Sequence, residues 1–362
     1  MTRSLLLASS FPPTRGGLET LLYQTVRRLA EPPLVLAPPP ASAPDLFVRQ
    51  IGTGTIGRLA YRPMWRVLPP LHYLSTFWRA AIDAARVWRP DVVQVGHVDL
   101  GLLGWLLRRP FVVYAHGQEM VRCGSVIDRL LRGRVLRAAS AVLVQGSFTG
   151  GLVGAWGVPA ARIVQVPFGA EPRPAADPSS GSTLLAVGRL VPRKGIDTLL
   201  RALARLPATI QARIVGGGPD GPRLRQLAQE LGVADRVCFL GTVDEAALQA
   251  EYRRCALFVL PTRRTPEGGL EGFGLVFFEA AAWGRPVVAG RSGGEVDAVV
   301  DGKTGRLVDG ESVEELVDVI RELLDDQQQL RRLGAEGRRR VETTHNWGCA
   351  GAAVDHVLDR VR

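Results

Sequence analysis

The sequence predicts an α/β protein made of two Rossmann-like, doubly wound domains. The chain has 362 residues, which is more than one ordinary hydrophobic core accommodates. Short apolar runs alternate with segments of helical periodicity, and this alternation is typical of βαβ units around a parallel sheet. It stops at a stretch rich in proline and serine, residues 171–182, and then starts again. We therefore expect two domains joined by a linker.

The first domain is expected over residues 1–170. Its strands are predicted at the apolar runs 5–8, 34–37, 92–95, 111–114, 141–145 and 163–166. Amphipathic helices are predicted between them, most clearly over 18–29 and 73–87.

The second domain is expected over residues 183–345. Its strands are predicted at 183–187, 212–216, 236–240, 257–261, 286–289 and 305–308. Helices are predicted at 195–206, 222–232, 244–254, 275–283 and 312–324. The segment 346–362 holds a last helix that no strand follows, and we expect it to pack on the first domain. Tandem domains of this kind predict a ligand cleft lined by the carboxyl ends of both sheets.

The positive charge of the chain is confined to its N-terminal half. Residues 1–173 contain 20 arginines, no lysine and nine acidic residues, a net charge of +11, whereas residues 174–362 carry −1. Such a surface suits nucleic acid, an anionic membrane or an acidic ligand, or is simply a solvated basic face. No zinc-finger spacing or aromatic RNA-binding signature accompanies the arginines, so nucleic acid is not expected. Among partners, an anionic membrane surface is preferred.

Cysteine spacing and hydropathy bound the location of the protein. The four cysteines, at positions 123, 238, 255 and 349, show no paired spacing, which argues against a zinc site or a disulfide framework. The apolar run 4–8 is too short for a signal peptide, and no run approaches the ~18 apolar residues of a membrane span. We expect a cytoplasmic protein whose membrane contact, if any, is peripheral on the inner face of the cell membrane.

Two carboxylates, Glu271 and Glu279, flank a turn that leads from an apolar strand into an apolar helix. The turn between them contains Gly272, Phe273, Gly274 and Leu275. The first amides of a helix have no partner within it, so this turn offers an anion site beside the carboxylates. Carboxylates suit sugar hydroxyls and amides suit phosphate oxygens. The pattern predicts a sugar-nucleotide site, although glutamates near a helix start also act as dipole partners.

A second cluster, Arg189 and Lys194, follows the predicted strand 183–187. Arginine presents a planar fork to phosphate oxygens, and lysine a compact charge on a flexible stem, so the two suit a diphosphate. Lysine is rare in this chain, since only Lys194 and Lys303 are lysines among 45 basic side chains.

A third pattern, the glycine-rich run 216–221, matches the spacing of a dinucleotide fingerprint. No carboxylate ends the next strand, within 237–243, so the expected ribose contact of a nicotinamide dehydrogenase is missing. We interpret Gly216 and Gly218 as positions of close backbone approach to a nucleotide.

Together these motifs resemble the retaining glycosyltransferases of family 4, which have the GT-B fold. The resemblance spans nearly the whole chain and is carried by residues 188–195, 215–219, 239–241, 261–262, 271–279, 284–288, 293–294 and 301–305. Upstream, residues 11–19 with Gly16 and Gly17 look like the family's first glycine turn, and 116–119 like its histidine loop. Residues 188–195, 263–279 and 289–294 look closest to bacterial mannosyltransferases that act on phosphatidylinositol mannosides and use GDP-mannose.

The resemblance implies a reaction without a protein nucleophile. The acceptor hydroxyl attacks from the front face while the departing diphosphate helps to deprotonate it. The partners implied are a nucleotide-sugar donor and a lipid or glycan acceptor. The amides of Gly16, Gly17 and Gly274 are expected to help stabilise the diphosphate. No Asp-x-Asp motif occurs in the chain, and we expect transfer that needs neither a metal nor a cofactor.

The resemblance also assigns roles to side chains. Arg189 and Lys194 are expected to neutralise the leaving diphosphate. Glu271 is expected to hold hydroxyls of the donor sugar, and Glu279 those of the ribose. His116 is expected beside the sugar, where it fixes a hydroxyl or shares positive charge at the anomeric carbon.

Several alternatives stay open at this point. One is a transferase of the same family that uses a UDP-sugar. Another is a sugar-nucleotide epimerase or phosphorylase of the same architecture, which needs no second acceptor. A non-catalytic sugar-nucleotide sensor is the alternative from a different class.

Overall fold

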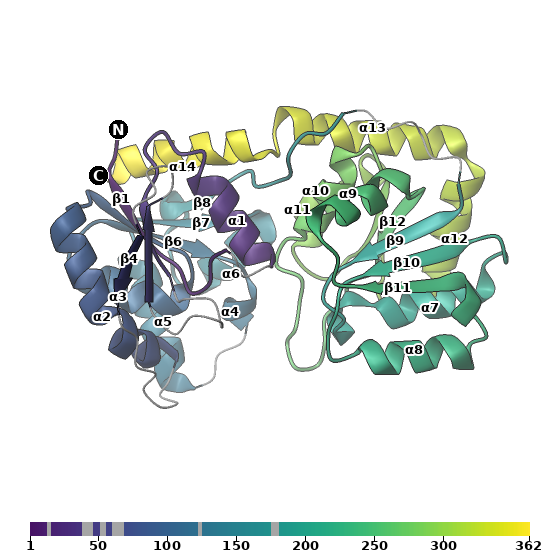
Figure 1. Ribbon diagram of the computed structural model, residues 1–362, viewed down its shortest axis with the longest axis horizontal. Coiled ribbons are helices and arrows are strands. Elements are labelled where there is room, and N and C mark those ends of the chain that lie inside the picture. The colour runs from purple at the N-terminus through teal and green to yellow at the C-terminus, as the bar shows by residue number, and fades with distance from the viewer. Residues whose placement is uncertain (13–15, 38–45, 51–55, 60–68, 122–124, 175–180) are drawn as a thin grey trace. The chain divides into compact units, whose positions relative to one another are not determined.

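The structure is a computed structural model that describes the chain apart from residues 13–15, 38–45, 51–55, 60–68, 122–124 and 175–180 (Figure 1). Between residues 46 and 76 it describes the backbone elements alone. The chain forms two compact units, Met1–Phe168 with Trp347–Arg362, and Gly169–Asn346. We call them the N-terminal and the C-terminal unit.

The N-terminal unit is built on an eight-stranded sheet of order β4-β3-β2-β1-β5-β6-β7-β8. Its strands are β1 (Ser4–Leu7), β2 (Leu34–Ala37), β3 (Leu46–Gln50), β4 (Ile56–Leu59), β5 (Val92–Val95), β6 (Phe111–Ala115), β7 (Ala141–Val144) and β8 (Ile163–Gln165). All neighbours pair in parallel except that β3 pairs antiparallel with both β2 and β4. These two strands were not predicted, because they follow β2 without the helix that the βαβ pattern requires.

Helices cover this sheet. They are α1 (Gly17–Val26), α2 (Pro69–Trp88), α3 (Gly101–Leu106), α4 (Gln118–Val121), α5 (Val126–Ala138), α6 (Ser147–Ala155) and α14 (Trp347–Val361). Alternate residues of the strands, such as Leu5 and Leu7, form a buried cluster with α2, α3 and α5. Helix α14 packs against α1 within the same unit, and Asp355 of α14 accepts a hydrogen bond of 2.9 Å from the amide of Ala30. Gly351 lets the two segments approach, since a Cβ there would lie 3.0 Å from Arg28 Cβ.

The C-terminal unit is built on a six-stranded parallel sheet of order β11-β10-β9-β12-β13-β14. Its strands are β9 (Thr183–Val187), β10 (Gln211–Val215), β11 (Val237–Gly241), β12 (Leu257–Leu260), β13 (Val287–Gly290) and β14 (Gly305–Val308). The strand order reverses between β9 and β12, and ligands of such sheets bind at the carboxyl ends of the strands beside this switch point. Two doubly wound α/β units are therefore confirmed.

The helices of the C-terminal unit are α7 (Ile196–Arg205), α8 (Gly221–Glu230), α9 (Glu245–Arg254), α10 (Leu275–Ala282), α11 (Glu295–Ala298), α12 (Val313–Asp325) and α13 (Gln327–Thr343). Helix α13 was not predicted, because its sequence is strongly charged and two glycines interrupt its apolar stripe. Those glycines let it lie close to its neighbours: a Cβ at Gly334 would sit 2.1 Å from the carbonyl oxygen of Gly284. Among the described helices of both units, none is long and apolar enough to cross a membrane.

Candidate functional site

At the switch point of the C-terminal unit, one carboxylate oxygen holds two cations. The Lys194 ammonium donates to Oε2 of Glu271 at 2.5 Å, and Arg193 Nη1 donates to the same oxygen at 2.8 Å. The side chains of Lys194 and Glu271 are only 9% and 13% exposed. The structure thus brings together two residues that lie 77 positions apart, one after β9 and one after β12. We call Arg193, Lys194 and Glu271 the ion-paired cluster.

The cluster keeps Glu271 ionised. Burial by itself would raise the pKa of this carboxyl, but the charges and hydrogen bonds of Lys194 and Arg193 outweigh burial and hold the pKa below its ordinary value. The other oxygen, Oε1, makes no hydrogen bond with a described residue. An ammonium has three donors and uses one of them on Glu271. The cluster therefore has a carboxylate oxygen for a hydroxyl and N–H groups for an anion.

The turn between β9 and α7 places Lys194. Gly195 adopts a left-handed conformation with φ 66°, and a Cβ there would lie 1.9 Å from the carbonyl oxygen of Pro261. Only glycine allows this turn to lie directly on the end of β12. Arg189, at the start of the same loop, is exposed and makes no hydrogen bond or ion pair with a described residue. It is therefore available to a ligand without breaking an internal contact.

The two glycines predicted to approach a nucleotide instead meet protein backbone. A Cβ at Gly216 would lie 2.0 Å from the carbonyl oxygen of Gly188, and one at Gly218 would lie 2.3 Å from that of Leu190. Because Gly216 and Gly218 have no side chains, the loop that carries Arg189 can pack closely against the loop after β10. A contact between them and a nucleotide stays a prediction.

The predicted anion turn has a backbone support beneath it. Gly274 caps α10 in a left-handed conformation, φ 87°, and Leu275 is the first helical residue. The amide of Gly294 donates to the carbonyl oxygen of Glu271 at 2.8 Å, and a Cβ at Gly294 would lie 1.9 Å from the carbonyl oxygen of Gly272. The loop after β13 therefore fixes the position of the turn.

Of the turn residues, Phe273 is unsuited to contact a ligand through its ring. The side chain is buried and stacks on Phe278 with ring centroids 5.2 Å apart. A ligand at this turn would therefore contact the backbone of Phe273.

Glu279 lies on α10 with a different partner. Tyr252 donates its hydroxyl to Oε2 of Glu279 at 2.7 Å, and burial raises the pKa of this carboxyl in spite of that hydrogen bond. In the described part of the chain no hydrogen bond or ion pair joins Glu279 to the ion-paired cluster. The two glutamates therefore occupy separate environments on one unit.

Sequence reasoning missed a third glutamate, Glu295. It is fully buried, and its Oε1 accepts hydrogen bonds from the Thr262 hydroxyl at 3.0 Å and from the amide and hydroxyl of Ser292 at 2.9 Å. These bonds tie the loop after β13 to the end of β12. Burial raises the pKa of this carboxyl. Its place directly after the pair of glycines at 293 and 294 is the signal that the sequence offered.

In the N-terminal unit, His116 bridges three neighbouring strand ends. Its Nε2 donates to the carbonyl oxygen of Gly96 after β5 at 2.8 Å, and its Nδ1 accepts from the Gln145 amide after β7 at 2.8 Å. The backbone amide of His116 donates to Oε1 of Glu119 at 2.5 Å. Burial lowers the pKa of His116, which fits the neutral form that this pairing requires. The ring is fixed in one tautomer, with both nitrogens engaged.

A second imidazole lies beside it. The His97 ring stacks on that of His116 with centroids 6.0 Å apart, and its Nδ1 lies 3.4 Å from Asp99 Oδ2. Arg132 Nη2 in turn lies 2.9 Å from Asp99 Oδ1. Sequence reasoning missed His97 and Gln145, since each becomes informative only when the sheet order places it beside His116.

The first glycine turn, before α1, already has a carboxylate beside it. A Cβ at Gly16 would lie 2.3 Å from Oε2 of Glu19, whereas one at Gly17 would meet no atom within 4 Å. The Glu19 carboxylate therefore lies close to the Gly16 backbone, and anion binding by the amides of this turn stays a prediction. Among the described residues, no group of three or more His, Cys, Asp or Glu side chains forms a metal site.

The fold is that of a two-unit, doubly wound α/β protein, and comparisons with known proteins give its family. Residues 170–340 match the model for "Glycosyl transferases group 1", and residues 16–169 match that for a "Glycosyl transferase 4-like domain". The chain belongs to the group 1 glycosyltransferases and is a glycosyltransferase.

Among characterised relatives, mannosyltransferases are prominent. The chain is 32% identical, over 99% of its length and 98% of the relative, to a GDP-mannose-dependent alpha-(1-6)-phosphatidylinositol monomannoside mannosyltransferase of Mycobacterium tuberculosis. A protein of the same description from Mycolicibacterium smegmatis is 32% identical over 98% of this chain and 97% of that one. A D-inositol 3-phosphate glycosyltransferase of the latter organism is 31% identical over 99% of this chain and 86% of the relative.

Solved structures share the fold. Anabaena Alr3699/HepE in complex with UDP-glucose superimposes with a TM-score of 0.80 at 20% identity, covering 99% of this chain and 100% of that one. Sucrose-phosphate synthase from Thermosynechococcus elongatus gives 0.78 at 22% identity, covering 99% of both chains. These are GT-B glycosyltransferases, so the GT-B class expected from the sequence is confirmed.

Proposed function

We propose that this glycosyltransferase moves mannose from GDP-mannose to a hydroxyl of a lipid-linked acceptor, a phosphatidylinositol mannoside, with retention of anomeric configuration. The observation that carries the proposal is the similarity to phosphatidylinositol monomannoside mannosyltransferases over both units of the chain. A similarity confined to the C-terminal unit would support a donor alone, whereas this one also includes the unit expected to take the acceptor.

The ion-paired cluster supports the donor half of this proposal. Lys194 and Arg189 neutralise the diphosphate, while Oε1 of Glu271 accepts a hydrogen bond from a sugar hydroxyl. Because Lys194 is hydrogen-bonded to Glu271, the cluster fixes the sugar relative to its leaving group. Preorganised donors of this kind contribute roughly 3 kcal/mol each to the transition state.

The transfer step follows from these contacts. The bond between the anomeric carbon and the diphosphate oxygen breaks, and the acceptor oxygen forms its bond on the same face. The acceptor proton passes to the departing diphosphate. Lys194 and Arg189 stabilise the charge that develops there, so the step needs no protein nucleophile and no metal.

Two further residues take supporting roles in the proposal. Glu279 holds the ribose hydroxyls through its Oε1, since Tyr252 already donates to Oε2. His116 serves the transfer as a neutral ring fixed by Gly96 and Gln145, so it adds no charge to the site. The backbone of the 272–275 turn is assigned to the phosphates.

A second donor is favoured by one observation. The HepE structure that matches this fold at a TM-score of 0.80 contains UDP-glucose. A UDP-sugar-dependent transferase is therefore the alternative, since backbone contacts with the base leave little trace in a sequence.

The deciding experiment offers the enzyme a choice of donors. Purified protein is incubated with phosphatidylinositol monomannoside and GDP-mannose, UDP-glucose or UDP-galactose, and the lipids are analysed by mass spectrometry. The proposal predicts a gain of one hexose with GDP-mannose and none with the UDP-sugars. Gain from a UDP-sugar alone supports the alternative. Conversion of a donor in the absence of lipid indicates an epimerase and refutes transfer.

A further inference from the structure

A buried glutamate lies beside the 272–275 turn, and the proposed transfer gives it no role. Glu295 is 0% exposed. Its Oε1 accepts hydrogen bonds from the Thr262 hydroxyl at 3.0 Å and from the amide and hydroxyl of Ser292, each at 2.9 Å. Its Oε2 is buried as well, but makes no hydrogen bond with a described residue. A buried polar atom without a partner is rare in folded proteins, so this side chain calls for an explanation other than packing.

Two glycines bring Glu295 close to the backbone of the turn. A Cβ at Gly293 would lie 2.8 Å from Oε2 of Glu295 and 2.5 Å from the carbonyl oxygen of Glu271. Gly294 donates its amide to that same carbonyl oxygen at 2.8 Å. A side chain at either glycine would meet the backbone of residues 271–273. The loop that Glu295 holds, residues 291–294, therefore packs directly against the start of the turn.

The surroundings of Glu295 favour its neutral, protonated form. Burial raises the pKa of its carboxyl in spite of the hydrogen bonds to Oε1, and the negative charge of Glu271 raises it further. Glu295 forms no ion pair with a described residue. An ionised carboxyl in the core without a cation is costly, and a protonated one costs less. The pKa values of the two neighbouring glutamates are thus shifted in opposite directions, that of Glu271 downwards and that of Glu295 upwards.

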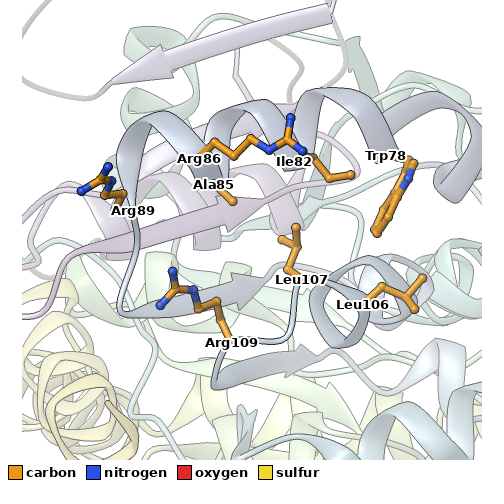
Figure 2. A pocket seen from close by; sticks show the side chains of 8 residues that line it. All are labelled: Trp78, Ile82, Ala85, Arg86, Arg89, Leu106, Leu107 and Arg109. Carbon is orange, nitrogen blue, oxygen red and sulfur yellow. The ribbon is translucent and has the colours of Figure 1, made fainter.

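An open groove in the N-terminal unit shows the contrast with this buried position. The groove has a volume of about 720 Å³ and is lined by residues of α2 and α3 and of the segment that follows α3. Figure 2 shows Arg89 and Arg109 at one end of it, with Trp78 and Leu106 at the other. Polar side chains of an open groove can be satisfied by water. Glu295 has no exposed surface, so its effect has to pass through its neighbours inside the C-terminal unit.

We propose that Glu295 is a positioning residue for donor binding: as a neutral acid it holds the loop 291–294 against the turn, and so fixes the turn amides and the Glu271 carboxylate for the donor. The inference rests on the proposed function, because it takes this turn as the place of the donor phosphates. It deepens that function by adding a buried residue that touches no ligand. An ionised carboxyl at this position would place a second negative charge near amides that bind phosphate.

Two substitutions at position 295 separate the hydrogen bonds from the volume of the side chain. Glu295→Gln keeps a neutral group whose oxygen accepts the same hydrogen bonds, so donor affinity should stay within about twofold of the wild type. Glu295→Leu leaves Ser292 and Thr262 without their acceptor, so the dissociation constant of the donor should rise about tenfold. Isothermal titration calorimetry with GDP-mannose and with UDP-glucose measures both. A loss in Glu295→Gln as large as that in Glu295→Leu would overturn the neutral form.

A milder variant keeps the test decisive if Glu295→Leu fails to fold. Ser292→Ala removes one hydroxyl donor to Oε1 and leaves the glutamate and its other hydrogen bonds in place. The dissociation constant of the donor should rise about threefold, as expected for the loss of one hydrogen bond. Wild-type affinity in Ser292→Ala would contradict the role of this loop.

Thr304→Val is the matched control for loss of stability. Thr304 is buried in the same unit, and its hydroxyl oxygen accepts from the amide of Val300 at 2.9 Å. Like Glu295→Leu, this substitution removes a buried acceptor of a loop amide, but the loop is not 291–294. Both variants should melt at a lower temperature than the wild type, and only Glu295→Leu should bind the donor more weakly. Equal weakening in both would indicate a general loss of stability and refute the assignment.

Amide hydrogen exchange in the ligand-free protein tests the positioning without a donor. A peptide that covers residues 271–277 includes the Phe277 amide, which donates to the carbonyl oxygen of Gly274 at 3.0 Å. Its exchange should be about tenfold faster in Glu295→Leu than in the wild type, and unchanged in Glu295→Gln. Unchanged exchange in Glu295→Leu would refute the proposal whether or not a donor binds. If the wild type binds no nucleotide sugar while exchange changes as expected, the proposed function fails and the positioning of the turn by Glu295 stands.

Discussion

The carboxyl ends of the two sheets carry different chemistry. In the C-terminal unit, Glu271 is ionised and shared by Lys194 and Arg193. In the N-terminal unit, His116 is neutral and held by a backbone carbonyl and an amide. The central side chain is therefore a charged carboxylate at one edge and a neutral imidazole at the other. The difference teaches that similar doubly wound sheets can carry unlike chemistry, because the side chains at their strand ends differ.

The largest expected effect belongs to Lys194 and Arg189. Each of Lys194→Ala and Arg189→Ala should lower kcat about 100-fold or more, because each removes a preorganised donor to the leaving diphosphate. The two should differ in stability: Lys194→Ala lowers the melting temperature by leaving Glu271 with one partner, whereas Arg189→Ala leaves it unchanged. Lys303→Ala, the exchange of the other lysine in the chain, is the control and should behave as wild type. Normal turnover in either variant removes that residue from the mechanism.

A smaller effect is expected at Arg193, which the structure added to the cluster. Arg193→Ala should reduce kcat/KM about tenfold, since Lys194 still holds Glu271 and a charged hydrogen bond contributes about 1.5 kcal/mol. Steady-state kinetics of Arg193→Ala and of Arg193→Lys, which keeps the charge, measure this loss of kcat/KM. A loss as large as that of Lys194→Ala would mean that Arg193, too, contacts the donor.

At the neutral edge, His116→Gln should keep about a tenth of the wild-type kcat, because glutamine presents a neutral polar group of similar reach. Burial keeps the pKa of His116 below its ordinary value. The profile of log(kcat/KM) against pH should therefore have the same shape near pH 6.5 in the wild type and in His116→Gln. A step that His116→Gln abolishes would identify a titrating base and break the contrast between the edges.

His116 and Glu271 should also lower the free energy of unfolding in different pH ranges. The folded-state pKa of His116 is lowered from 6.5, so the unfolded chain takes up its proton first, and stability falls as pH drops below about 6.5. The folded-state pKa of Glu271 is lowered from 4.5, so its contribution is present above about pH 4.5 and is lost below it.

Melting curves of His116→Gln and Glu271→Gln against wild type, from pH 7 to pH 3.5, measure these contributions separately. The melting temperature of His116→Gln should rise relative to that of the wild type between pH 6.5 and 5. The melting temperature of Glu271→Gln should lie below that of the wild type, and this difference should shrink only near and below pH 4.5. The reverse order would refute the assigned charge states.

The smallest expected effect is that of a chelator. If side chains and amides stabilise the leaving group, turnover in excess EDTA should stay within about twofold of the untreated rate. Loss of activity that magnesium or manganese restores would place a metal in the transfer step.

The sequence was most informative where chemistry is local. The strand-end positions of Arg189, Lys194 and Glu271 followed from apolar runs and turns, and so did the parallel strands of both sheets. Their partners did not follow, because Arg193 meets Glu271 across 78 positions and Gln145 meets His116 only through the order of β6 and β7. Helix α13 and strands β3 and β4 were missed for a related reason: their places depend on packing and pairing that periodicity does not encode.

The most direct test of the account is the affinity of the C-terminal unit's ion-paired cluster for the donor. Isothermal titration calorimetry with GDP-mannose, without acceptor, compares the wild type with Lys194→Ala and with the control Lys303→Ala. The account predicts wild-type affinity for the control and about 30-fold weaker binding for Lys194→Ala, the loss expected for a charged hydrogen bond of about 2 kcal/mol. Equal affinity in all three proteins would contradict the claim that Lys194 holds the diphosphate.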